Sequence, residues 1–258
     1  MPSRGAPKTV ARRGDLVAER DPQRPSGWLL RQRDMDASYV DLADPRHLEF
    51  DYLRWIRIVL RVARARRVLH IGGGACALPR ALAAEDPDGR QEVCEIDADV
   101  LALAREHLGL RRAPGLHVRH AEGRAFVAGQ PDAGWDAVVI DAFVGAAVPR
   151  RLITMQALAD VARVAPLALI NVVDNRAARE VRAVAAGLAV AYSRVWSLGG
   201  RAGNTVVAGG GAALPLRLIA ARAAADPSPA RLTPPRAMIQ QLAGTPPLDD
   251  HDVSDGGA

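Results

Sequence analysis

The sequence predicts an α/β protein built around a doubly wound parallel sheet. From Val68 onward, short apolar runs alternate with helical patterns, which is typical of consecutive βαβ units. The first run ends in three glycines at 72–74, and the second ends near Glu95, about 20 residues further on. This spacing is typical of a nucleotide-binding βαβ unit. A chain of 258 residues is long enough for one such domain with appendages.

Residues 1–65 are expected to form a tail and a small cap. Residues 1–25 are rich in Pro, Arg, Gly and Asp and lack periodicity, which predicts a disordered tail. Residues 26–65 are expected to form an N-terminal β/α cap. In this cap, strands at Trp28–Leu30 and Ser38–Val40 flank a polar turn, and a helix follows from about Leu48 to Val62.

Residues 66–210 are expected to form a nucleoside-binding, Rossmann-like domain. Strands are predicted at 68–71, 92–96, 116–118, 137–140 and 168–173, and helices at 77–84, 100–108, 152–164 and 177–187. Asp97 is a suitable N-cap for the second helix, and Gly109 ends it. Two closing strands at 189–195 and 205–208 predict a reversed edge strand. Residues 211–258 are expected to form two helices and a loose acidic end.

Composition excludes several kinds of chemistry. Lys8 is the single lysine, so the folded domain has no Schiff-base lysine and no P-loop. Cys76 and Cys94 are too far apart for a CxxC motif, and His117 and His120 lack an evident third ligand, so no metal site is expected. The arginines are scattered, and no apolar stretch reaches about 18 residues. We therefore expect no nucleic acid, no membrane and a cytoplasmic location.

Polar and glycine residues at the ends of predicted strands are candidate ligand contacts. Glycine lets a ligand approach the backbone without meeting a Cβ atom, and an acid after the second strand can accept hydrogen bonds from ribose hydroxyls. An acid after the third strand can contact adenine or simply occupy a turn. These candidates are Gly72, Gly73, Gly74, Glu95, Glu122 and Gly123.

Asp141 leaves the fourth predicted strand. The carboxyl ends of the first and fourth strands flank the topological switch point of such a sheet, where ligands bind. Asp141 is therefore expected to point into the pocket, as a ligand contact or as a base. Asn171 and Asp174 close the fifth strand and can reach the same cleft, although Asp174 can equally cap the helix that follows.

Four stretches together resemble the spermidine synthase-like (polyamine aminopropyltransferase) family. They are Val68-Leu69-His70-Ile71-Gly72-Gly73-Gly74, Cys94-Glu95-Ile96-Asp97, Glu122-Gly123 and Trp135-Asp136-Ala137-Val138-Val139-Ile140-Asp141. The resemblance runs from roughly Trp28 to Ala208 and implies the class I S-adenosylmethionine-dependent methyltransferase fold. It also implies a small-molecule acceptor and a homodimer.

The same resemblance assigns roles to the candidate residues. It implies that Gly72–Gly74 cradle the aminoacyl or aminopropyl arm of S-adenosylmethionine or decarboxylated S-adenosylmethionine. It implies that Glu95 holds the ribose and that Glu122 lies near adenine. Asp141 is expected to orient or deprotonate the acceptor, with Tyr52 and Asp174 lining the acceptor pocket.

Four positions depart from the family pattern. Glu122 stands where the family usually has an aspartate, Ala75 replaces an acid after the glycines, Val144 replaces the second acid of the catalytic loop, and Leu53 replaces a glutamine. Holding a chain of ammonium groups requires several carboxylates. The sequence therefore favours transfer of an alkyl, aminopropyl-type group to an amine or other small acceptor over standard polyamine synthesis. A small-molecule methyltransferase and a non-catalytic nucleoside-binding domain are the alternatives.

Overall fold

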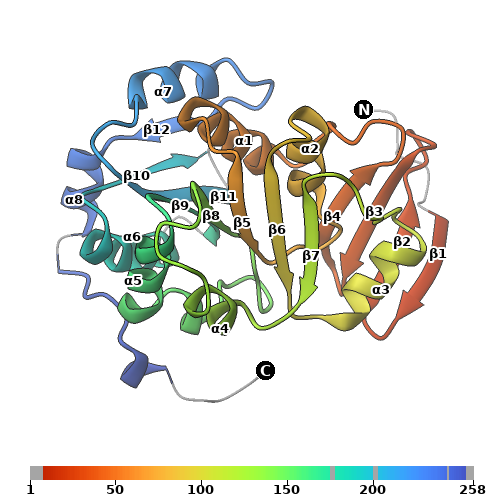
Figure 1. Cartoon of the computed structure of the whole chain (residues 1–258), viewed down its shortest axis with the longest axis horizontal. Coiled ribbons are helices and arrows are strands. Elements are labelled where there is room, and N and C mark those ends of the chain that lie inside the picture. Colours follow the sequence, from red (N-terminus) through yellow and green to blue (C-terminus); the bar gives the residue numbers. More distant parts are fainter. Residues whose placement is uncertain (1–7, 175–177, 200–202, 243, 254–258) are drawn as a thin grey trace.

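The computed structural model describes residues 8–174, 178–199, 203–242 and 244–253, and it contains two sheets. The larger sheet has eight strands in the order β12-β10-β11-β9-β8-β5-β6-β7. A four-stranded sheet stands beside the β7 edge and α3 (Figure 1). This arrangement confirms the expected α/β class and adds a larger cap than the sequence predicted.

The smaller sheet is an antiparallel meander. Its strands are β1 (Lys8–Arg13), β2 (Leu16–Arg20), β3 (Gly27–Gln32) and β4 (Met35–Asp41). Leu16, Ala18 and Leu30 point from one face of this sheet into the main core. The expectation of a disordered tail over 1–25 is therefore wrong from Lys8 onward, because Leu16–Ala18 buries enough apolar surface to hold β2 in place. Residues 1–7 lie outside the described part.

The strands of the larger sheet follow the predicted alternation. They are β5 (Arg67–Ile71), β6 (Arg90–Glu95), β7 (Leu116–His120), β8 (Ala137–Ile140), β9 (Leu167–Asp174), β10 (Arg194–Gly199), β11 (Gly203–Gly210) and β12 (Arg231–Thr233). The strands β7-β6-β5-β8-β9 are parallel, and β11 runs antiparallel to β9. A reversed strand is present, but β11 lies inside the sheet, between β9 and β10, and not at its edge as expected. The strand order changes direction between β5 and β8, so a topological switch point lies between their carboxyl ends.

Helices cover both faces of the larger sheet (Figure 1). They are α1 (Asp51–Ala63), α2 (Ala77–Glu85), α3 (Ala98–Glu106), α4 (Gly123–Ala128), α5 (Met155–Val164), α6 (Arg179–Ala191), α7 (Leu216–Ala224) and α8 (Pro235–Leu242), with short 3₁₀ turns η1 (Arg150–Leu152) and η2 (Asp250–Asp252). One core cluster joins α1, α2 and α7 to the sheet. A second joins α5, α6 and α8 to its other face.

Three expectations about the second half of the chain need correction. The strand expected at 189–195 begins only at Arg194, because α6 continues to Ala191 through an alanine- and valine-rich stretch. The acidic end is attached to the fold up to Val253, because Arg124 on α4 donates a hydrogen bond to the carboxylate of Asp250. Ala178, not Asp174, is the N-cap of α6. The side chain of Asp174 lies outside the described part, so its predicted place in the acceptor pocket stays a prediction.

Candidate functional site

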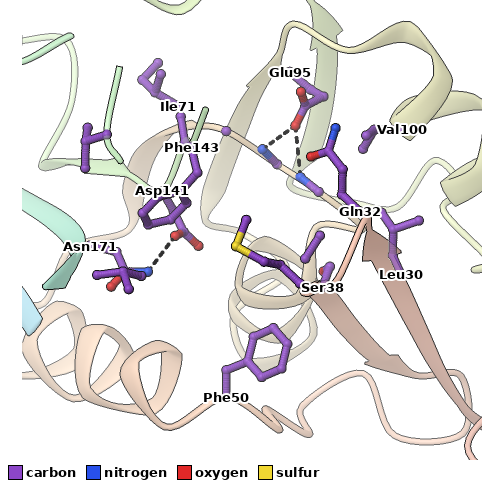
Figure 2. Close-up of a pocket in the computed structure, with 18 of the residues that line it drawn as sticks. Leu30, Gln32, Ser38, Phe50, Ile71, Glu95, Val100, Asp141, Phe143 and Asn171 are labelled. Atoms are coloured by element: carbon purple, nitrogen blue, oxygen red, sulfur yellow. Dashed lines mark hydrogen bonds between the residues drawn. The ribbon is translucent and has the colours of Figure 1, made fainter. Parts of the chain in front are cut away.

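A cavity of about 1510 Å³ opens where the carboxyl ends of β5, β6 and β8 face the smaller sheet. The cavity collects nine of the residues singled out from the sequence: Tyr52, Gly72, Gly73, Gly74, Glu95, Glu122, Gly123, Asp141 and Asn171. Figure 2 shows several of the lining side chains around the open space. The topological switch point thus has a cavity large enough for a nucleoside and a second small molecule.

The glycine loop between β5 and α2 has no room for side chains. Gly72 has φ +85°, and a Cβ atom there would lie 2.2 Å from the carbonyl oxygen of Asp141. A Cβ at Gly73 would lie 2.7 Å from a methyl group of Val93. The loop therefore needs glycine to pass between β6 and β8, and this requirement leaves bare backbone at the cavity wall.

Glu95 holds this loop in shape. Its Oε2 accepts hydrogen bonds from the backbone N–H groups of Gly73 at 2.8 Å and Gly74 at 3.0 Å (Figure 2). Its Oε1 accepts from the N–H of Asp97 at 2.9 Å. A carboxylate has about four acceptor positions, so one remains for a ligand hydroxyl. The sequence predicts a ligand contact for Glu95, which stays a prediction, and it does not reveal this loop-organising role, which depends on hydrogen bonds across 21 and 22 residues.

Glu122 and Gly123 form the start of α4. The carboxylate of Glu122 caps the helix by accepting from the N–H groups of Arg124 at 3.0 Å and Ala125 at 2.7 Å. A Cβ at Gly123 would lie 2.5 Å from Ile71, so glycine lets α4 begin directly against β5. The carboxylate of Glu122 is positioned on the cavity wall by the helix itself.

Asp141 forms a cluster with Tyr52 and Asn171. The Tyr52 hydroxyl donates to Oδ2 of Asp141 at 3.0 Å, and the Asn171 amide donates to Oδ1 at 2.9 Å. Burial raises the pKa of Asp141, and the nearby charge of Glu95 adds to this effect, whereas the two hydrogen bonds oppose it. Burial and the negative charge of Asp141 raise the pKa of Tyr52, so its hydroxyl stays protonated and donates.

The cluster lacks positive charge and has a spare acceptor. Among the described residues, no ion pair joins Asp141 to an arginine or histidine. Asn171 is only 1% exposed, and its Oδ1 has no hydrogen-bond partner there. A buried carbonyl oxygen without a partner is costly, as is a carboxylate without a counter-charge. A cationic N–H donor in the cavity would relieve both costs.

The smaller sheet supplies a wall that the sequence did not predict as functional. Leu30, Gln32 and Ser38 from β3 and β4 line the cavity on the same side as the glycine loop (Figure 2). A Cβ at Gly74 would lie 3.2 Å from the Cβ of Ser38, so the loop and the smaller sheet are in close contact. These positions carry no motif, and only the folded arrangement reveals them.

The described residues contain no group of three or more His, Cys, Asp or Glu side chains placed to hold a metal ion. His70 is buried in β5, where its Nε2 lies 2.9 Å from Oε1 of Gln91. Burial lowers the pKa of His70 to about 4, so the ring is neutral at physiological pH. No helix in the described part is long and apolar enough to cross a membrane.

Comparisons with known proteins find similarity in sequence and in structure. No family model matches the chain. A polyamine aminopropyltransferase of Vibrio vulnificus (strain CMCP6) is 28% identical over 130 residues, which is 49% of this chain and 43% of the relative. The match therefore spans less than half of that relative's length.

Solved structures match over most of the chain. A probable spermidine synthase from Corynebacterium glutamicum is 26% identical with a TM-score of 0.82, covering 94% of this chain and 95% of the other. The spermidine synthase from Thermotoga maritima is 13% identical with a TM-score of 0.62, covering 88% and 80%. Human methyltransferase-like protein 13 in complex with SAH is 16% identical with a TM-score of 0.55, covering 79% and 97%. The chain thus has a class I methyltransferase-like fold and resembles spermidine synthases in sequence and structure.

Proposed function

We propose that this protein is a transferase that moves an aminopropyl-type group from an adenosyl sulfonium donor to a small amine. One observation carries the proposal. The glycine loop organised by Glu95 and the Asp141–Tyr52–Asn171 cluster face the same cavity. The names of the Vibrio and Corynebacterium relatives describe this class of reaction and support the proposal.

The donor half of the cavity fits an adenosyl thioether or sulfonium. Bare backbone at 72–74 leaves space for the arm on sulfur, and the free acceptor position of Glu95 suits a ribose hydroxyl. Glu122, capping α4, is available to an adenine amino group. We propose these roles for the three elements.

The arginines of the cavity favour decarboxylated S-adenosylmethionine over the intact molecule. The intact molecule carries a carboxylate that needs a cation or several donors. Arg33 pairs with Asp15 at 2.9 Å, and Arg150 pairs with Glu180 at 2.7 Å. Arg151 lies 3.6 Å from Glu122, whereas Arg20 lies over the neutral Trp28 ring, so three of the four lining arginines in the described part face a carboxylate.

The reaction needs alignment and one proton acceptor. The sulfonium donor supplies a good leaving group. The amine nitrogen forms a bond to the carbon next to sulfur, the carbon–sulfur bond breaks with its electron pair going to sulfur, and the nitrogen loses one proton to Asp141. A raised pKa makes this carboxylate a better base. Tyr52 and Asn171 hold the carboxylate in place, and alignment of nitrogen with carbon supplies the rest of the catalysis.

Calorimetry with three adenosyl compounds tests the proposal. We expect decarboxylated S-adenosylmethionine and methylthioadenosine to bind more tightly than S-adenosylmethionine, and mass spectrometry to detect an aminopropylated amine. Preference for intact S-adenosylmethionine together with a methylated product would replace the proposal with methyl transfer. Binding without turnover on any amine would favour a non-catalytic nucleoside-binding domain.

A further inference from the structure

Part of the cavity wall near Asp141 is apolar. Val144 is 69% exposed and Val173 is 37% exposed, and both line the cavity. Phe50 and Phe143, which are partly buried, line it too (Figure 2). When a ligand covers large apolar side chains that are exposed inside a cavity, the removal of their surface from water favours binding. This part of the wall is suited to a hydrocarbon group.

An ordered turn presents Val144 next to Asp141. The N–H of Val144 donates to the carbonyl of Ala147 at 2.9 Å, and the N–H of Ala147 donates back to the carbonyl of Val144 at 3.3 Å. Gly145 in this turn has φ +62° and open space around it. The exposed valine is therefore held in place by a closed hydrogen-bonded turn three residues after the carboxylate.

The neighbouring acids already have partners. Glu49 lies 3.0 Å from His47, and Asp51 accepts the Tyr52 N–H at 2.7 Å in the first turn of α1. Asp36, on β4, pairs with Arg31 at 3.2 Å. A second ammonium group on the acceptor would have to compete with these partners. Asp51 lies at the positive end of the α1 dipole, whereas Asp141 has only two neutral donors and takes one positive charge without displacing a partner.

We infer that the acceptor is a primary monoamine with an apolar body, and not a diamine. This inference rests on the proposed function and names the substrate class of the same site. The amine nitrogen lies against Asp141 and Oδ1 of Asn171, and the hydrocarbon chain covers Val144, Val173 and Phe143. A diamine of the same length places a charged group where the monoamine places a methyl group, so it loses that apolar contact and part of the hydration of its second charge.

Calorimetry of amine binding to the protein saturated with methylthioadenosine tests the inference. We compare n-hexylamine with 1,6-diaminohexane, which differ only in the second amino group. The monoamine is expected to bind at least about tenfold more tightly, and affinity in the series from propylamine to hexylamine to rise by about fourfold per methylene. Equal or tighter binding of the diamine overturns the inference, as does the absence of amine binding.

A substitution on the apolar wall provides a second test. Val144→Asp places a carboxylate where the second amino group of the diamine would lie, so it is expected to reverse the preference toward 1,6-diaminohexane. Val190→Asp is the matched control, because Val190 on α6 is 59% exposed and does not line the cavity. This control is expected to leave the preference unchanged. An unchanged preference in Val144→Asp contradicts the inference.

The two hypotheses fail in different ways. If methylthioadenosine does not bind, the proposed function fails and the inference fails with it. If methylthioadenosine binds and aminopropyl transfer is detected, but diamines are preferred, only the choice of a monoamine is overturned.

Discussion

Asp141 is the residue to which we assign the proton transfer in the proposed reaction, and it is held at a cost to stability. Its carboxylate is stabilised by two neutral donors, Tyr52 and Asn171, and by no cation among the described residues. Burial raises its pKa, so the charged form is disfavoured in the folded protein. A site that binds a positively charged donor and an amine benefits from this uncompensated negative charge.

Asp141→Asn is expected to lower turnover by about 100-fold or more, because a general base contributes on the order of 10²–10⁴. The affinity for methylthioadenosine is expected to stay within about threefold, since Glu95 and the glycine loop are unchanged. Steady-state kinetics and calorimetry measure the two effects. Asp132→Asn, at an exposed acid that pairs with Arg163, is the control. Unchanged turnover in Asp141→Asn contradicts its role.

The same substitution changes how stability depends on pH. A carboxyl group with a raised pKa in the folded state binds its proton more tightly when folded, so stability is lost as pH rises through that pKa. An asparagine at position 141 does not ionise, so this pH-dependent loss of stability does not occur. Asn171 can turn its amide to accept a hydrogen bond from the new side chain. Asp141→Asn is expected to raise Tm more at pH 8 than at pH 4, as thermal melts can measure. An equal shift at both pH values would show that the charge of Asp141 carries no cost.

Glu95 is expected to affect both folding and binding. Glu95→Gln keeps the size of the side chain but replaces an acceptor by an NH₂ group that meets the amide donors of Gly73, Gly74 or Asp97. The free energy of unfolding is expected to fall by about 1–3 kcal/mol, as for a buried donor left unpaired. Methylthioadenosine binding is expected to weaken by about tenfold or more. Denaturant unfolding and calorimetry test both, and unchanged affinity would remove Glu95 from the ligand site.

At the scale of elements, the turn from β5 into α2 fixes the site. Gly72 lets this turn pass against the backbone of Asp141, which links the donor half of the cavity to the acceptor half. The N–H of Asp141 also donates to the carbonyl of Ile71 at 2.8 Å. A disturbance in the turn is therefore transmitted directly to the carboxylate.

A pair of alanine substitutions separates crowding from backbone strain. Gly72→Ala and Gly145→Ala both place alanine at a positive φ, +85° and +62°. Gly145→Ala meets no atom within 4 Å and is expected to cost about 1 kcal/mol. Gly72→Ala adds the clash with Asp141 and is expected to cost about 3 kcal/mol or more. Denaturant unfolding measures both, and equal costs would contradict the close approach at Gly72.

The sequence predicted the elements whose signals are local. The apolar run, glycines, helix and acid of β5-α2-β6 lie within about 30 residues, so their order alone reveals the unit. The hydrogen bond from Tyr52 to Asp141 joins residues 89 positions apart, so no local sequence pattern predicts it. The sequence predicts too few strands in the smaller sheet, because half of the residues of β1 are basic and only Leu16–Ala18 in β2 is strongly apolar. The end of α6 was misplaced because a run of alanine and valine suits both a helix and a strand.

At the scale of the whole molecule, the two sheets meet around one cavity. The smaller sheet contributes Gln32 and Ser38, and the larger sheet contributes the glycine loop and Asp141. A ligand that contacts both walls binds the folded protein and not the unfolded chain, so it stabilises the whole structure by mass action. This property gives a measurement that does not depend on knowing the acceptor.

The binding of methylthioadenosine, followed by calorimetry and thermal melting of the intact protein, tests the central claim most directly. We predict one molecule bound per chain and, at about 100 times Kd, a stabilisation of about 2.7 kcal/mol. For a chain of this size, this corresponds to a rise in Tm of about 5–10 °C. No heat of binding and an unchanged Tm at millimolar methylthioadenosine would contradict the account.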